Sequence, residues 1–140
     1  MTQVFFYHGA ADKIAAACAL LGKACQQGKP VLVYAPDADL AAQLDRLLWT
    51  QPAIGFFPHC RADAPLAAET PILITDTLDT LAQDDRLMNL GSAVPPGFSR
   101  FQSLIEVVGQ EDEDRQAARD RVKFYKDRGY EIRYFDLASH

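Results

Sequence analysis

The side chains best suited to nucleophilic or metal chemistry are His59 and Cys60, which are neighbours in the sequence. A cysteine nucleophile needs an imidazole that faces it, whereas adjacent residues on a strand or loop rarely point the same way. His8 and Asp63 could complete a set of metal ligands, but these positions are scattered and match no spacing typical of a zinc site. The residues therefore predict neither a cysteine catalyst nor a metal centre.

Phosphate binding is the second chemistry that the sequence could support. Gly9 follows an apolar run, but neither GxGxxG nor GxxxxGKS/T occurs, and a single glycine leaves the close-approach positions occupied by side chains. The GxSxG turn of serine hydrolases is also absent from the sequence. Four aspartates could supply an acid pair, although turns and helix caps favour them equally: Asp76, Asp79, Asp84 and Asp85. We expect no enzyme, and a nucleotide-dependent enzyme is the alternative.

Positive charge is concentrated near the C-terminus of a chain whose net charge is −5. The segment 115–133 holds seven of the 14 lysines and arginines: Arg115, Arg119, Arg121, Lys123, Lys126, Arg128 and Arg133. An acidic chain repels phosphate polymers at long range, so tight direct binding of nucleic acid is not the first expectation. A local basic surface can still attract an acidic peptide.

A helix over 111–129 would sort these charges by direction. At about 100° per residue, one stripe contains Arg115, Arg119, Val122, Lys123 and Lys126, which we call the basic stripe. The acidic residues Glu113, Asp120 and Asp127 fall to one side of it, and the sheet-facing side contains Ala117, Ala118, Phe124 and Tyr125. Arg121 and Arg128 lie along this apolar side, so they must reach solvent or find carboxylate partners.

The basic stripe has two interpretations. In the simpler one it is a solvated helix face. The helix dipole favours acidic residues at the N-terminal end, here EDED, and basic residues towards the C-terminal end. However, the stripe includes the apolar Val122 and gathers like charges that repel one another at i, i+4. Such a surface suits a short acidic peptide that ends in a hydrophobic residue with a free carboxylate. Single-stranded DNA, bound through its phosphates, is the third possibility.

The elements that must position these residues alternate along the chain. Apolar runs predict strands at 4–9, 31–35, 72–76, 87–91, 103–109 and 130–137. Helices are predicted within 10–28, from a cap at Asp37 or Asp39 to about Trp49, and over 111–129, with a Pro- and Ala-rich loop at 50–70. This order indicates an α/β fold with a mostly parallel sheet and helices on both faces.

Composition sets the remaining bounds. The 140 residues, 49% of them hydrophobic, suit one domain over 1–140. No apolar run could span a bilayer, and the start MTQVFFYHGA does not resemble a signal peptide, so we expect a cytoplasmic protein without membrane contact. The chain has three cysteines, Cys18, Cys25 and Cys60. An odd number without CxxC spacing indicates free thiols in a reducing compartment.

Several motifs carry a family resemblance. The segment RLLWTQPAIGFFPH, residues 46–59, resembles the LW…P…F.PH segment of the chi subunit of bacterial DNA polymerase III. Further matches follow in the family's order: FYHG (6–9), ILIT (72–75), LMNL (87–90), F..F..LIEVV (98–108) and ARDRVKFYKDRGYEI (118–132). None of them is a catalytic signature, but together they span nearly the whole chain.

The resemblance implies a non-enzymatic adaptor of the clamp-loader assembly, with a Rossmann-like fold that lacks a working nucleotide site and needs no cofactor. One surface of such an adaptor binds the psi subunit; another binds the acidic, phenylalanine-ended C-terminal tail of single-stranded-DNA-binding protein, so contact with nucleic acid is indirect. By position, the tail site falls on Arg119, Val122, Lys123 and Lys126. Family members often carry an aromatic residue at the position of Val122, so valine implies a smaller apolar platform.

The psi surface implied by the same comparison lies in the 49–58 segment, at Trp49, Phe56, Phe57 and Pro58. Large apolar groups in a loop that bears Pro and Gly are typical of a partner-binding patch. They could also fill the core beneath the loop. For Trp49, at the end of an amphipathic helix, core and interface remain equal alternatives, whereas the interface is favoured for Phe56.

Overall fold

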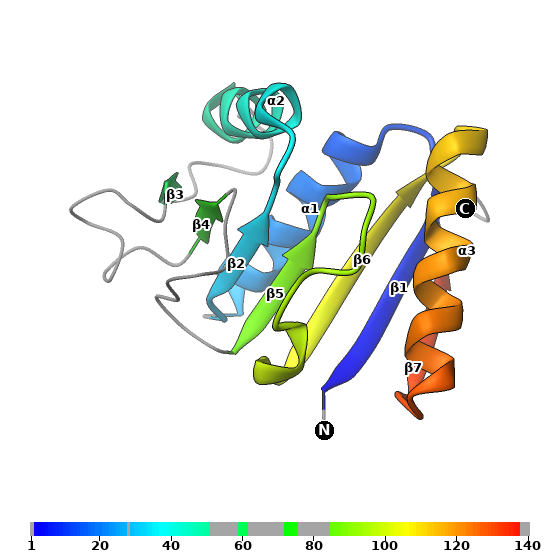
Figure 1. Ribbon diagram of the computed structural model, residues 1–140. Coiled ribbons are helices and arrows are strands. Elements are labelled where there is room, and N and C mark those ends of the chain that lie inside the picture. The colour runs from blue at the N-terminus through cyan, green and yellow to red at the C-terminus, as the bar shows by residue number, and fades with distance from the viewer. Residues whose placement is uncertain (1, 28, 51–58, 62–71, 76–84, 138–140) are drawn as a thin grey trace.

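The computed structural model describes residues 2–27, 29–50, 59–61, 72–75 and 85–137, and their side chains except at 25–26, 48–50 and 59–61. The elements, drawn in Figure 1, are β1 (Gln3–Ala10), α1 (Lys13–Gln26), β2 (Val31–Tyr34), α2 (Ala38–Thr50), β3 (His59–Arg61), β4 (Ile72–Thr75), β5 (Arg86–Asn89), the 3-10 helix η3 (Phe98–Arg100), β6 (Ser103–Gly109), α3 (Asp112–Asp127) and β7 (Ile132–Asp136).

The described strands form one sheet in the order β3-β4-β2-β5-β6-β1-β7, and every pair of neighbours in it is parallel. The predicted Rossmann-like α/β fold is therefore confirmed. β3 falls where a loop was predicted, since a three-residue strand leaves too little alternation to read. β1 lies between β6 and β7, so segments from the two ends of the chain meet at one edge of the sheet (Figure 1).

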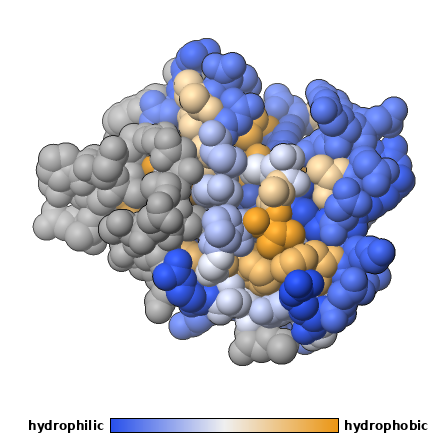
Figure 2. All heavy atoms as spheres, viewed as in Figure 1, coloured by the Kyte–Doolittle hydropathy of each residue, from blue (hydrophilic) through white to orange (hydrophobic). Residues whose placement is uncertain are grey.

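Alternating side chains of the sheet build two cores. Val31 and Val33 point to the face covered by α1 and α2, whereas Leu32 between them points to the face of α3. Figure 1 shows α3 in front of the sheet and α1 behind it, so helices lie on both faces as predicted. On the face seen in Figure 2, hydrophilic side chains follow α3, and an apolar area lies beside it.

Aspartates begin both helices of the rear layer. An Oδ1 atom of Asp12 accepts the backbone N–H groups of Ile14 and Ala15 at 3.1 and 3.2 Å. Asp37 does the same at the start of α2, with Asp39 and Leu40 at 2.9 and 3.5 Å. Of the two predicted caps for this helix, Asp37 is therefore the one used, because it stands directly before the first helical turn.

A buried polar network fastens α3 to the sheet. Glu106 of β6 is fully buried, and its Oε2 accepts Nε of Arg121 at 3.1 Å and the hydroxyl of Tyr125. Asn89 of β5 donates to both carboxylate oxygens at 3.0 and 3.2 Å. Nη1 of Arg121 donates to the carbonyl of Ser92 at 2.9 Å. The carboxylate partner that the sequence required for Arg121 is thus Glu106.

Two opposing effects act on the charge of this network. Burial raises the pKa of the Glu106 carboxyl, whereas Arg121 and the hydrogen bonds from Tyr125 and Asn89 lower it. Burial and the adjacent carboxylate also raise the pKa of Tyr125, so its phenol stays protonated and remains a donor. The two helix residues and the strand residue therefore depend on one another for their pairing.

Replacement of Arg121 by methionine should lower the free energy of unfolding by about 3–5 kcal/mol, because it leaves the Glu106 carboxylate buried without its counter-ion. Denaturant unfolding followed by circular dichroism measures the change. Arg119→Met, on the exposed side of the same helix, is the matched control and should stay within about 0.5 kcal/mol of the wild type. Equal stability of Arg121→Met and the wild type would contradict a role for this ion pair in holding α3.

Candidate functional site

A cavity of about 500 Å³ lies between α3 and the sheet edge formed by β1 and β7. We call it the basic groove. It is lined by Phe6, His8, Val108, Arg115, Ala118, Arg119, Val122, Lys123, Lys126, Asp127 and Tyr134. The α3 side is mostly charged and the sheet side mostly apolar, so one depression combines cations with hydrophobic surface.

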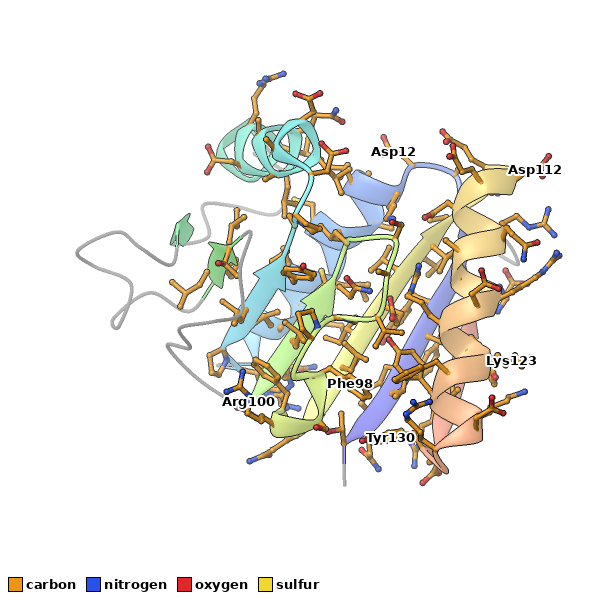
Figure 3. The ribbon with its side chains drawn as sticks, in the orientation of Figure 1. Asp12, Phe98, Arg100, Asp112, Lys123 and Tyr130 are labelled. Carbon is orange, nitrogen blue, oxygen red and sulfur yellow. The ribbon has the colours of Figure 1, made fainter. Side chains whose placement is uncertain are left out.

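All four residues predicted for the tail site line this groove: Arg119, Val122, Lys123 and Lys126. The reason is the rotation of α3. Ala118, Arg121 and Tyr125 are buried against the sheet, and this inward row leaves the neighbouring row, the basic stripe, along the edge of the helix. Figure 3 shows Lys123 projecting from the side of α3 away from the middle of the sheet.

The floor of the groove comes from the sheet. Phe6 of β1, Val108 of β6 and Ala118 form a small buried cluster, against which Val122 packs. The small platform expected from valine is therefore supplemented by apolar side chains beneath it. The sequence reasoning did not identify Phe6, His8, Val108 or Tyr134 as groove residues. The alternation of side chains along a strand shows which residues share a face of the sheet. It identifies groove residues only once the order of the strands is known.

The cations of the groove differ in their partners. Arg115 lies 3.9 Å from Asp112 in an exposed i, i+3 pair, and the ammonium of Lys126 lies 5.8 Å from the ring centroid of Tyr134. Within the part of the chain that the structure describes, Arg119 and Lys123 form no ion pair. These two side chains are exposed and available to an external carboxylate.

Asp127, the last residue of α3, and Arg128, its C-cap, can be compared with the positions expected for them on a helix over 111–129. Asp127 lines the groove rather than lying apart from the basic stripe, because the cavity continues to the end of α3, where side chains from the last turn reach the β7 side. Arg128 is exposed, and its guanidinium stacks 3.6 Å from the centroid of Phe124. Arg128 therefore reaches solvent, one of the two outcomes expected for it, and does not line the groove.

A second cavity, of about 1,070 Å³, lies at the carboxyl ends of the central strands, where a Rossmann-like sheet usually binds nucleotides. At the starts of α1 and α2, Asp12 and Asp37 each accept two backbone N–H groups that a phosphate could otherwise use. Asp114 accepts the N–H of Gly109 at 2.7 Å and pairs with Lys13 at 3.1 Å. These carboxylates would repel phosphate, and this geometry favours the expectation that no nucleotide binds.

Gly9 has a backbone role in this region. Its φ of 75° lies in the left-handed range that favours glycine, and the register of β1 against β6 shifts between Tyr7 and Ala10. Its carbonyl accepts the side-chain amide of Gln110 at 3.0 Å. The glycine thus permits an irregularity in the strand, which accounts for its presence without any phosphate.

The other candidate chemical groups gather into no site among the described residues. No group of three His, Cys, Asp or Glu side chains within that part of the chain could hold a metal ion. Cys18 is buried in the rear core, where burial raises the pKa of its thiol. Asp85 pairs with Arg86 at 3.3 Å. The remaining candidates lie outside the described side chains: Cys25, His59, Cys60, Asp63, Asp76, Asp79 and Asp84.

The segment expected to bind psi lies largely beyond what the structure describes. Phe56, Phe57 and Pro58 are outside the described residues, and Trp49 lies near the end of α2 with its side chain undescribed. The alternatives of core and interface for Trp49 therefore stay open. Separately, none of the described helices is long and apolar enough to cross a membrane.

Comparisons with known proteins agree on one family. The family described as "DNA polymerase III chi subunit, HolC" matches residues 1–133. The DNA polymerase III subunit chi of Pseudomonas aeruginosa is 34% identical over 136 residues, which cover 94% of each chain. That of Escherichia coli is 28% identical over 116 residues, covering 82% of this chain and 79% of the relative. The resemblance seen in the sequence motifs is confirmed, and this chain belongs to the DNA polymerase III chi subunit family.

Proposed function

We propose that the protein is a non-catalytic adaptor of the DNA polymerase III clamp-loader assembly. In this proposal the basic groove binds the acidic C-terminal tail of single-stranded-DNA-binding protein, and the region from Trp49 to Pro58 binds the psi subunit. The observation that carries the proposal is the groove itself, in which the exposed cations Arg119 and Lys123, which form no ion pair with any described residue, border an apolar floor.

The groove suits this peptide because its two surfaces match the two parts of the ligand. Carboxylates along the tail would meet the cations of α3, and a terminal phenylalanine would enter towards Phe6 and Val108. Each exposed charge pair contributes about 0.2–1 kcal/mol, and the cations mainly speed encounter and orient the chain. The affinity should be modest, on the order of micromolar.

The psi half of the proposal is supported by family membership and by composition. Trp49, Phe56 and Phe57 put three aromatic residues into a short stretch, and aromatic side chains are frequent anchors of protein interfaces. None of these residues is among the described residues that line the basic groove. The two partners would therefore contact different residues of the chain.

Alanine at Arg119 or Lys123 should weaken binding of the tail peptide about two- to fivefold each, because each change removes one exposed charge that faces the ligand. Fluorescence anisotropy with a labelled peptide of the cognate tail measures the affinity. Arg128→Ala is the matched control, since this exposed arginine caps the C-terminal end of the same helix but does not line the groove. Absence of binding, or equal affinity in all variants, would move the search to the Trp49–Pro58 region.

Salt should weaken the same interaction. Raising the salt from 50 to 500 mM screens exposed charges, so the dissociation constant of the tail peptide should rise several-fold. An affinity unchanged over this range would contradict a charge-based mechanism. A bare oligonucleotide without partner protein should bind negligibly at physiological salt, and strong binding there would favour direct contact with single-stranded DNA.

Alanine at Phe56 should abolish or strongly reduce recovery of a chi–psi complex, because truncating an aromatic anchor commonly costs an interface about 2 kcal/mol or more. Co-expression with tagged psi, followed by size-exclusion chromatography, tests this. Arg119→Ala should retain psi, since Arg119 lies in the basic groove, and none of the residues proposed to bind psi is among the described residues that line it. Full recovery of the complex with both Phe56→Ala and Trp49→Ala would refute the assignment of this surface.

A further inference from the structure

The outermost strand of the described sheet, β7, presents an open edge. It stands last in the order of strands and pairs on its inner side with β1, so no described strand covers its outer side. The two large hydrophobic side chains that are exposed in the described part of the chain, Tyr134 at 48% and Phe135 at 39%, both belong to it. An open edge with exposed apolar side chains is a place where a further strand can be added.

The hydrogen bonds between β7 and β1 show which backbone groups of β7 remain for such a strand. The carbonyl of Glu131 accepts the N–H of Val4 at 3.2 Å, and Leu137 donates its own N–H to a carbonyl of β1 at 2.8 Å. Along a strand, the N–H and C=O groups of successive residues point alternately to its two sides. Ile132 and Tyr134 therefore direct their backbone groups outward, away from β1.

The charges along this edge are complementary to themselves. Glu131 directly precedes β7 and Arg133 belongs to it; both are exposed, and neither forms an ion pair with a described residue. Charges of one sign on an edge strand discourage pairing, but these two have opposite signs. In an antiparallel second copy with Ile132 opposite Ile132, each Glu131 faces an Arg133. Because Ile132 directs its backbone groups outward, this register also forms a hydrogen-bonded pair at its centre.

The neighbouring registers fit less well. With Arg133 opposite Arg133, like charges meet, and such a cross-strand pair is destabilising. With Tyr134 opposite Tyr134, Arg133 faces Phe135, and no unlike charges stand directly opposite each other. The register centred on Ile132 also uses both exposed rings. It places Tyr134 opposite Tyr130 of the second copy, and Phe135, two residues after Arg133 on the same face, beside the charge pair.

We propose that β7 is a self-association surface, through which two copies of this chain pair as antiparallel strands. The pair is centred on Ile132 and held by the cross-strand charge pairs of Glu131 with Arg133. The inference goes beyond the proposed function and does not depend on it. The two-fold axis of such a pair is perpendicular to the sheet, so α3 of both copies lies on the same face. Two short strand edges bury little area, so the dimer is weak, with a Kd on the order of 100 μM.

Charge reversal tests both the surface and its register. Glu131→Arg alone, or Arg133→Glu alone, should weaken self-association at least tenfold, because only like charges then face each other across the two strands. A mixture of these two variants should associate about as strongly as the wild type, since unlike charges again stand opposite each other. Sedimentation velocity of the full chain, from about 10 μM to about 1 mM at low salt, measures the association. Thermal unfolding checks that each variant is folded.

Lys23→Glu and Glu113→Arg are the matched controls, because they make the same changes of net charge at exposed positions of α1 and α3. Each should self-associate as the wild type does, alone and mixed with the other. A wild-type chain that stays monomeric up to about 1 mM would overturn the inference. So would a dimer that tolerates the reversals at Glu131 and Arg133, or a mixture of these variants that does not recover association.

Discussion

The ion pair between Arg121 and Glu106 is the constraint on which the rest of the groove depends. A purely apolar helix face could rotate on the sheet at small cost, whereas a buried guanidinium has to meet its carboxylate. Tyr125, one turn later, donates to the same oxygen, so two successive turns of α3 are fixed in direction. With these residues turned inward, the row from Arg115 to Lys126 must border the edge of the sheet. The buried pair of Arg121 and Glu106 thus determines which side chains of α3 line the basic groove.

The sequence predicted the residues that α3 contributes to the groove. Spacing alone placed Arg119, Val122, Lys123 and Lys126 together, because helical periodicity is a local property. Phe6, Val108 and Tyr134 were missed because they come from three strands whose adjacency depends on the order of the sheet. The same reason hid Glu106 as the partner of Arg121. β3 was missed as well, since a strand of three residues carries almost no alternation to read.

The carboxyl ends of the strands are the place where a Rossmann-like fold usually binds a nucleotide. The positive ends of helices are usually the feature that recruits phosphate. Here Asp12 and Asp37 accept N–H groups at the starts of α1 and α2, and Asp114 takes a further N–H from Gly109. The same aspartates cap two helices and place negative charge where this fold usually receives phosphate. In the proposed function, the ligand binds instead at the lateral edge of the sheet.

The position of β1 between β6 and β7 also has a consequence for folding. β1 pairs with β6 and with β7, and both strands follow it in the sequence by about a hundred residues or more. Such non-local pairing is slow to form. The walls of the groove, which include Phe6 and Tyr134, therefore come together only when these distant segments have met. The groove is a product of the slow, non-local part of folding, whereas α3 alone can form from local contacts.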